Sequence, residues 1–479
     1  MPNIMTAPAG SVKVRMYKQG FGDCFLIALP GRDGKPAYVL IDCGVHHKDK
    51  DNLAKMNRTA KSVKEATDGR LELVAVTHEH TDHIDGFKLA KEVFDGVAMD
   101  NVWMGWTEDY ANPRVKALDR AFAVHLEALK IVRDKLKSSR SGLWETIDNL
   151  LAFYGEELGA AGRMSNRETM TWVQKKGGGG LKFCAPGEVL TLDRVDDVRF
   201  FVLGPPLLDS LLKKSAPSSG KNKETYITDP ENAHLDDFAL EVIRQEGATS
   251  GVLSDADAKN ALAARHPFED RYRVSAKDAK LDPDHAFDDY LSRKNSWRRI
   301  DDKWLELAGE LALKLDEHTN NTSLALAIEI GAGRNVLLFP GDAQVGNWLG
   351  WQDLKWKDGR KETTIDDLLG RTVLYKVGHH GSHNATLKKL GLEKMTHPDL
   401  AALLPVDEDF AKNVAKWTAI PYPDLLSRLM EKTRHRVIRS DKPAPGQKDR
   451  PYSLGKEEWK GFMKRIEETD LYTELTIAM

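Results

Sequence analysis

The sequence predicts an α/β fold in which sheet strands and amphipathic helices alternate along the chain. Residues 12–41 contain alternating and apolar runs separated by turn residues, a pattern typical of paired strands. Residues 114–137 and 300–315 carry apolar side chains at helical spacing. Apolar runs return at residues 324–330 and 373–377, where each ends in polar or glycine residues. Such alternation is typical of layered folds in which helices cover a sheet.

The composition limits the possible classes of protein. With 479 residues, of which 41% are hydrophobic, the chain can bury a large core. A formal net charge of -3 provides no global field for nucleic acid or membrane, so any contact with a polyanion must be local. The cysteines Cys24, Cys43 and Cys184 are odd in number and lack CxxC spacing, which favours a reducing compartment. No run approaches the roughly 20 apolar residues of a membrane span, so we expect a cytoplasmic protein without a membrane partner.

The N-terminal part of the chain reads as a sheet. We expect strands at residues 12–17, 24–29 and 37–41, because these short apolar runs are separated by turn residues. A further strand at residues 71–76 leads directly into a histidine-rich segment. That segment therefore lies in the loop at the carboxyl end of a strand, where α/β proteins usually place their chemistry.

The rest of the chain suggests one fold in two halves, separated by an insertion. We assign residues 1–206 to the first half, including a helical segment at 107–175. Residues 207–296 are polar and rich in Lys, Asp and Ser, which indicates an inserted cap or specificity region. Residues 297–479 then form the second half and a C-terminal covering segment.

The segment after the strand at 71–76 carries the densest set of metal-ligand types. His78, His80, Asp82 and His83 place four potential ligands within six residues. Two imidazoles spaced by one residue can point the same way from an extended loop and bind one cation. Asp82 and His83 can turn toward a neighbouring position, so one loop can contribute to two sites.

Two later strands also end in residues of this kind. Asp342 follows a strand at 335–339, and the pair His379 and His380 follows the strand at 373–377, with glycines beside each. A single histidine is most often an ordinary side chain, but three strand ends of this type favour a metal site. A pair of ions about 3.5 to 4 Å apart needs a bridging carboxylate and further imidazoles, which these positions supply. A structural zinc site would instead be compact and rich in thiolates.

These motifs resemble the metallo-β-lactamase superfamily. Residues 77–83 look like its signature loop, and Ile41-Asp42-Cys43-Gly44 looks like its preceding strand and acidic residue. More narrowly, four segments are similar to the lactamase-like domain of the DNA-uptake proteins ComEC/Rec2: residues 20–24, 320–324, 338–342 and 376–382. The resemblance spans residues 12–384. It implies a four-layer αββα sandwich carrying a largely helical insertion.

The resemblance also implies a ligand set for two divalent ions, Zn or Mn. His78 and His80 would hold one ion, and Asp342 would bridge both. The second ion would take the remaining ligands, which are Asp82, His83 and His380. Imidazole and carboxylate donors without thiolate suit zinc or manganese.

Further residues receive roles through the same resemblance. Asp42, and similarly Asp23, would orient a ligand histidine through its ring N–H. His379 would face the substrate or support a ligand from behind. His379 or His383 would donate a proton to a developing oxyanion or leaving group, although His383 is equally well explained as a plain loop residue. Asp82 or an oxygen of the substrate would orient the attacking water.

The sequence departs from the superfamily at Gly204, where a histidine normally follows the strand. The ion at His78 and His80 then keeps only those two residues and Asp342 from the protein. Three outcomes remain open: a looser two-ion site, replacement by a residue such as Asp209 or His234, or occupancy of a single site.

The leading functional hypothesis is a metal-dependent hydrolase, a phosphodiesterase or nuclease that uses metal-activated hydroxide on DNA, RNA or a cyclic nucleotide. One alternative is hydrolysis of another ester class, such as a phosphorylcholine-type ester, a lactone or a thioester. Another is a degenerate scaffold that binds a partner without catalysis. Trp348, Trp351 and Trp356 follow Asp342 and are interpreted as core residues, with base stacking as the alternative.

Overall fold

The computed structural model divides the chain into two compact units, each considered by itself. The first unit comprises Met1–Ala111, Ala152–Pro230 and Asp316–Met479, and the second comprises Asn112–Leu151 and Glu231–Leu315. The structure describes residues 4–137, 142–155, 164–214, 303–358 and 361–479, with isolated positions between 242 and 295. Most of the predicted insertion at 207–296 therefore lies outside the described residues.

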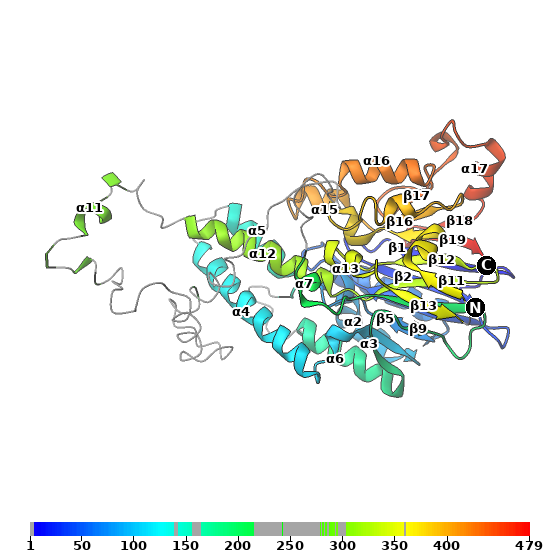
Figure 1. Ribbon diagram of the computed structural model, residues 1–479, viewed down its shortest axis with the longest axis horizontal. Coiled ribbons are helices and arrows are strands. Elements are labelled where there is room, and N and C mark those ends of the chain that lie inside the picture. The colour runs from blue at the N-terminus through cyan, green and yellow to red at the C-terminus, as the bar shows by residue number, and fades with distance from the viewer. Residues whose placement is uncertain are drawn as a thin grey trace. The chain divides into compact units, whose positions relative to one another are not determined.

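An eight-stranded mixed sheet forms one half of the first unit (Figure 1). Its strand order is β18-β19-β1-β2-β3-β5-β7-β8. The strands are β1 Ser11–Tyr17, β2 Cys24–Pro30, β3 Pro36–Cys43, β5 Leu73–Ala75, β7 Val102–Gly105, β8 Leu181–Cys184, β18 Ile466–Glu468 and β19 Tyr472–Ala478. Pairing is antiparallel from β18 to β3 and parallel from β3 to β8, so the loops after β5 and β7 leave the same edge.

A seven-stranded mixed sheet forms the other half, in the order β17-β16-β15-β12-β11-β10-β9. The strands are β9 Val189–Leu190, β10 Val198–Gly204, β11 Ala325–Ile330, β12 Asn335–Phe339, β15 Thr372–Lys376, β16 Ala401–Leu404 and β17 Val437–Arg439. The strands β12, β15, β16 and β17 run parallel, which brings the residues after β12 and β15 to one edge. Two short ribbons complete the strands: β4 Arg70–Leu71 with β6 Ala98–Met99, and β13 Lys355–Asp358 with β14 Lys361–Thr364.

The two large sheets share one apolar core. Every second residue of the facing strands is buried in it, including Val14 and Phe25 of the first sheet and Phe200 and Phe339 of the second. The rings of Phe25 and Phe339 meet edge to face with centroids 5.5 Å apart. Burying side chains of this size contributes roughly 1.5–3 kcal/mol each, so the contact between the sheets is a principal source of stability.

Helices cover the outer faces of both sheets. A second apolar cluster joins the first sheet to α1 Asn52–Ala66, α2 Thr81–Leu89, α3 Lys91–Asp95 and α6 Asn166–Gly177. A third joins the second sheet to α13 Val345–Gly350, α14 Ile365–Gly370 and α16 Pro423–Lys432. Figure 1 shows α2, α3 and α6 on one side of the strands and α16 on the other. The predicted α/β class is therefore confirmed for this unit, as mixed sheets between helices.

The remaining helices are short or belong to the second unit. In the first unit these are α7 Asp209–Leu212, α15 Glu408–Asn413 and α17 Lys456–Met463. The others are α4 Pro113–Leu136, α5 Gly142–Ala152, α11 Asp288–Leu291 and α12 Lys303–Asn321, whose residues from Asp316 onward belong to the first unit. The helix predicted at 114–137 corresponds to α4, which begins where the side chain of Asn112 accepts a hydrogen bond from the Arg114 N–H and Pro113 supplies the first helical position. Among the described residues, no helix is long and apolar enough to cross a membrane.

Two sequence expectations change in detail, and a third is confirmed. The strand predicted at 71–76 is divided at Glu72 into β4 and β5, because Leu71 pairs with Met99 in the small ribbon while Leu73 pairs with Val39. The helix expected to end before residue 320 continues to Asn321. Trp348, Trp351 and Trp356 are buried in the core beside the second sheet, as interpreted from the sequence.

Candidate metal centre

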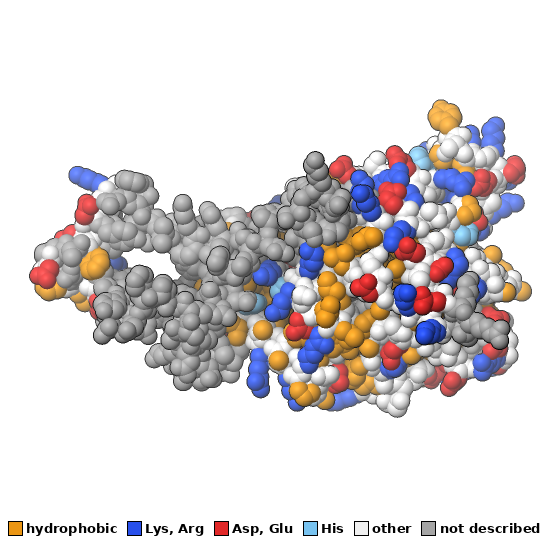
Figure 2. Space-filling view, viewed as in Figure 1, with side chains coloured by type: hydrophobic (Ala, Val, Ile, Leu, Met, Phe, Trp, Pro, Cys, Tyr) orange, Lys and Arg blue, Asp and Glu red, His pale blue; other side chains and the backbone are white. Residues whose placement is uncertain are grey.

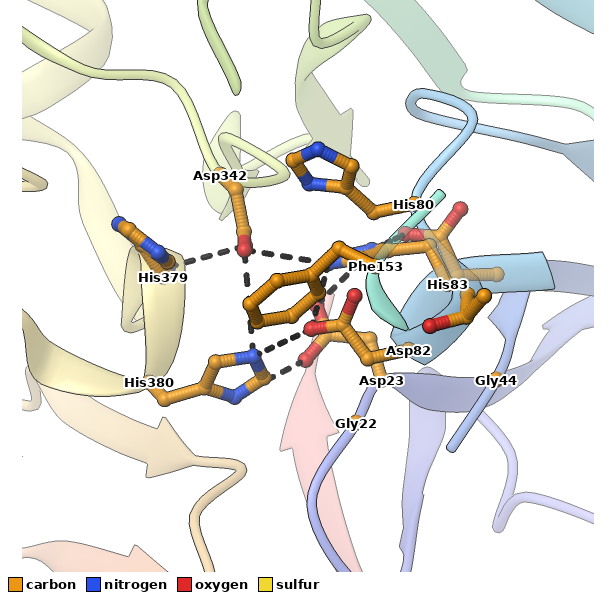
Figure 3. A network of polar contacts seen from close by, with 12 residues as sticks. Gly22, Asp23, Gly44, His80, Asp82, His83, Phe153, Asp342, His379 and His380 are labelled. Carbon is orange, nitrogen blue, oxygen red and sulfur yellow. Dashed lines mark hydrogen bonds and ion pairs between the residues drawn. The ribbon is translucent and has the colours of Figure 1, made fainter. Parts of the chain in front are cut away.

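Three loops from the two sheets meet at a cluster of buried acidic and imidazole groups (Figure 3). They follow β5, β12 and β15 and contribute Asp82, His83, Asp342 and His380. One ligand atom from each lies within 4.8 Å of every other, and all four residues are buried. Such a group can hold a metal ion. A second group, which shares His83, consists of Asp23, Asp42 and His83.

Two glycines allow the start of α2 to approach the first sheet. A Cβ atom on Gly44 would lie 2.2 Å from both the carbonyl carbon of Asp82 and the nitrogen of His83. A Cβ atom on Gly22 would lie 2.6 Å from the carbonyl oxygen of Asp82. The backbone of Asp82 can pack between these two strand ends only because neither position has a side chain.

Asp342 lies at the middle of the cluster. Its Oδ1 accepts hydrogen bonds from Lys376 Nζ at 3.1 Å and from the His379 N–H at 2.9 Å. Its Oδ2 lies 3.1 Å from Nε2 of His83 and 3.9 Å from Nε2 of His380. Burial raises the pKa of Asp342, but His83 and Lys376 outweigh that effect and hold the pKa well below its ordinary value. The carboxylate is therefore ionised, the form in which a carboxylate binds metal ions.

The loop after β15 adopts an unusual backbone conformation. His379 and His380 have φ of 43° and 51°, the left-handed region that residues other than glycine rarely adopt. This turn directs Nε2 of His380 to within 2.8 Å of Asp82 Oδ2 while the His379 N–H reaches Asp342. Strain of this kind is often concentrated at functional sites.

The two imidazoles of this cluster are held from behind. Nδ1 of His83 lies 2.8 Å from Oδ2 of Asp42, and Nδ1 of His380 lies 2.7 Å from the carbonyl oxygen of Pro405. Asp42 in turn accepts hydrogen bonds from the N–H and the hydroxyl of Thr77, each at 2.8 Å. Both rings consequently present Nε2 to the cluster.

Asp23 has a different main partner from the one expected. It pairs with the ammonium of Lys376, and its Oδ2 lies 3.8 Å from Nδ1 of His83, beyond hydrogen-bond distance. Burial lowers the pKa of Lys376, but Asp23 and Asp342 outweigh it and raise the pKa above its ordinary value. Sequence reasoning missed Lys376, although it is the only charged residue in the apolar run 373–377.

His78 and His80 form a separate pair within the same centre. Nε2 of His78 lies 3.1 Å from Nδ1 of His80, so two ring nitrogens face each other. The outward Nδ1 of His78 lies 3.3 Å from the hydroxyl of Ser323. Burial lowers the pKa of both rings, that of His80 to about 3, which favours the neutral imidazole that binds metals.

The position of the expected third imidazole is closed. A Cβ atom on Gly204 would lie 2.0 Å from Oδ1 of Asn347. That amide is fixed, because it donates to the carbonyl oxygens of Asn321 and Ser323 and accepts from Trp351. Of the replacements considered from the sequence, Asp209 is exposed on α7 and His234 lies outside the described residues.

The remaining predicted residues lie at the border of the cluster. Nδ1 of His379 lies 2.8 Å from the Ser382 hydroxyl, and burial lowers the pKa of His379 to about 4. His383 is half-buried, packs edge-on against Tyr422, and is not brought into the ligand group.

Aromatic rings that the sequence did not single out adjoin the centre. The ring of Phe21 lies 4.0 Å from that of His380, and the ring of Phe153 lies 5.2 Å from that of His80. Figure 3 shows Phe153 across the front of the cluster. Phe153 also stacks on Trp417, with centroids 5.3 Å apart and planes at 10°. These rings exclude water from one side of the centre.

The donors fit a divalent cation. Oδ1 of Asp82 and Nε2 of His83 are buried and have no hydrogen-bond partner among the described residues, although buried polar atoms normally have one. No protein-family model matches the chain, and no curated protein is significantly similar to it. The fold and the site themselves define the class: an α/β protein with buried Asp/His groups that can hold a metal ion.

Proposed function

We propose that the chain is a metal-dependent hydrolase with the metallo-β-lactamase fold and that it cleaves phosphodiesters. The observation that carries this proposal is the position of Asp342, whose carboxylate lies among His83, His380 and Lys376 at the meeting point of three strand ends. Two mixed sheets sharing one core between outer helices also agree with an αββα sandwich.

The ligand assignment is the one that the resemblance implies, and the grouping of Asp82, His83, Asp342 and His380 supports part of it. Asp82, His83 and His380 would hold one ion, His78 and His80 would hold a second, and Asp342 would contact both. When bound, divalent ions lower the pKa of water to about 7 and neutralise charge on phosphoryl oxygens.

Residues at the border of the centre would orient the substrate. His379 is neutral at pH 7, since burial lowers its pKa to about 4, and Nε2 of its ring lies 3.5 Å from Nδ2 of Asn320. A neutral imidazole can exchange hydrogen bonds with a phosphoryl oxygen or leaving group without adding charge. Phe21 and Phe153 would keep bulk water away from the side of the centre that their rings border.

The surface favours a compact phosphodiester over a long duplex. Lys and Arg side chains are interspersed with Asp and Glu over the described part of the face in Figure 2, and the net charge is -3. Recognition would then depend on the centre itself more than on an extended basic surface, which supplies most nonspecific affinity for nucleic acid. Cyclic nucleotides and short single strands are the substrates that fit best.

The test compares the wild-type protein with Asp82→Ala after metal analysis by mass spectrometry. Substrates are bis-p-nitrophenyl phosphate, cyclic nucleotides, single-stranded DNA and duplex DNA, with added Zn²⁺ or Mn²⁺. Asp470→Ala, an exposed position, provides the matched control. We expect diester cleavage that is lost in Asp82→Ala and retained in the control. Unchanged activity in Asp82→Ala would contradict the mechanism.

The aromatic rings beside the centre favour a second candidate, a phosphorylcholine-type ester. The stacked pair Phe153 and Trp417, together with Phe21, is a set of rings suited to a quaternary ammonium group. Hydrolysis of p-nitrophenyl phosphorylcholine that is much faster than that of bis-p-nitrophenyl phosphate would favour this candidate.

A further inference from the structure

We propose that Asp316 is the positioning residue for His80 and that it strengthens the half of the centre in which Gly204 provides no imidazole. The inference rests on the metal-binding part of the proposed function and is independent of the substrate. Asp316 lies near the end of α12, in a part of the chain that the sequence motifs did not include.

The carboxylate of Asp316 faces the outer nitrogen of His80. Its Oδ1 lies 3.8 Å from Nε2 of His80, and the two side chains are 9% and 2% exposed. Neither atom has a hydrogen-bond partner among the described residues. The other oxygen, Oδ2, accepts from Nδ2 of Asn320 at 3.0 Å, one helical turn away, which holds Oδ1 toward the ring.

A buried carboxylate with one hydrogen bond is costly without a further partner. Asp316 is 7% exposed as a whole residue, so its carboxylate is almost entirely removed from water. A hydrogen bond from a ring N–H of a metal-bound histidine would compensate for this burial. His80 Nε2 is the unpartnered group that faces it.

The two nitrogens of His80 have opposite surroundings. Nδ1 lies 3.1 Å from Nε2 of His78, on the side where the ion would bind, and Nε2 faces Asp316. His83 follows the same rule with Asp42 behind it, and His380 follows it with the carbonyl of Pro405. Asp316 therefore places a carboxylate 3.8 Å from the outer nitrogen of His80, on the side where His83 and His380 have hydrogen-bonded acceptors.

A carboxylate in this position fixes the tautomer of the ring and increases its basicity toward a metal. The effect is more important here than in the other half of the centre. Position 204 supplies no imidazole to His78 and His80, because it is a glycine and Asn347 closes the space beside it. A stronger donor at His80 compensates in part for that loss.

The experiment measures metal affinity instead of hydrolysis. Asp316→Asn keeps the size and removes the charge, and Glu317→Gln on the same helix provides the matched control. Each protein is titrated with Zn²⁺ against a competing chelator, and with Co²⁺ by its visible absorption. We expect two ions in the wild-type protein and a 10- to 100-fold lower affinity for one of them in Asp316→Asn, the usual range for such partners. The second ion and the control should be unaffected.

A spectroscopic measurement separates positioning from a purely structural role. In ¹⁵N-histidine-labelled, zinc-loaded protein, we expect a slowly exchanging Nε2–H signal that is absent from His80→Gln and shifted in Asp316→Asn. Asp316→Glu should restore part of the affinity.

Equal zinc affinity in wild-type and Asp316→Asn protein would overturn the inference, and so would a wild-type protein that binds a single ion. Diester hydrolysis in either case would leave the proposed function intact. Conversely, a selective loss of affinity in a protein that cleaves no diester would support Asp316 and contradict the proposed function.

Discussion

The two halves of the candidate centre are built by different means. In the first half, Asp82, His83, Asp342 and His380 form a compact buried group that can hold a metal ion. In the second half, the pair His78 and His80 receives no imidazole from position 204, which is Gly204, and the other candidate from the described residues, Asp209, is exposed on α7.

The side chains of the first half therefore come from loops that follow the strands of the two sheets. The outer ring nitrogens of His83 and His380 are already hydrogen-bonded. In the second half, the proposed support for His80 comes from Asp316 of α12, a residue of the first unit that lies far from the histidine loop in the sequence. Loss of a ligand in such a scaffold need not abolish a site when an outer partner can strengthen the ligands that remain. Four predictions test this difference.

The largest effect is expected where the two halves meet. Asp342→Ala removes the carboxylate that would contact both ions, so we expect loss of both and a decrease in diester hydrolysis on the order of 1000-fold, since a metal contributes several kcal/mol and each 1.36 kcal/mol is tenfold. Asp342→Asn is the conservative companion variant, because it keeps the size of the side chain and removes its charge. Lys376 keeps Asp23 as a partner in both variants. The measurements are initial rates and metal content. Activity within tenfold of wild type would contradict the assignment of Asp342 to the metal centre.

A smaller effect confined to the first half is expected from Asp42→Asn. The substitution weakens the acceptor behind His83 and preserves the shape, and asparagine tolerates the φ of 54° at this position. We expect about 10- to 100-fold weaker binding of one ion. The double variant with Asp316→Asn provides the sharper test: if the halves are independent, the two losses fall on different ions and their free energies add. Losses on the same ion would contradict the division.

The sequence pointed to the candidate ligands of both halves better than to the residues that support them, for a physical reason. His78, His80, Asp82 and His83 share one loop, and strand ends in a sheet predictably meet at one edge. Asp316 and Lys376 carry no local signal, because a helix and a strand are recognised by their apolar residues, and the polar exceptions gain meaning only from tertiary neighbours. The closure of Gly204 by Asn347 depends in the same way on the packing of α13.

That closure predicts a measurable loss of stability. Gly204→Ala adds a Cβ atom 2.0 Å from Oδ1 of Asn347, whose amide is held by three hydrogen bonds. We expect a decrease of about 1–3 kcal/mol in the free energy of unfolding, the usual cost of overpacking, measured by urea denaturation of the metal-free protein. Gly461→Ala, with open space around its Cβ, is the control. Equal stability of the two variants would mean that the position is open and that an imidazole could be introduced there.

The smallest effect is expected from a substitution at Glu329, which should leave metal binding in both halves of the centre unchanged. Glu329 on β11 is 5% exposed and pairs with Arg199, Arg334 and Arg371 at 2.5, 3.1 and 2.7 Å. Burial raises its pKa, but hydrogen bonds from Arg199 and Arg371 outweigh burial and lower the pKa below the ordinary 4.5. A depressed pKa contributes stability above the unfolded value, and that contribution disappears as the pH falls through the folded value.

Glu329→Gln should therefore cost roughly 1 kcal/mol at neutral pH, because the three arginines are partly exposed. The difference from wild type should shrink as the pH falls below 4.5 and should not change between pH 6 and 8. Unfolding of metal-free protein across this range measures it, with zinc affinity at pH 7 as the companion measurement. A change in zinc affinity would show that metal binding depends on the rigidity of the whole second sheet. The difference between the two halves would then arise from the entire scaffold and not from the residues next to each half.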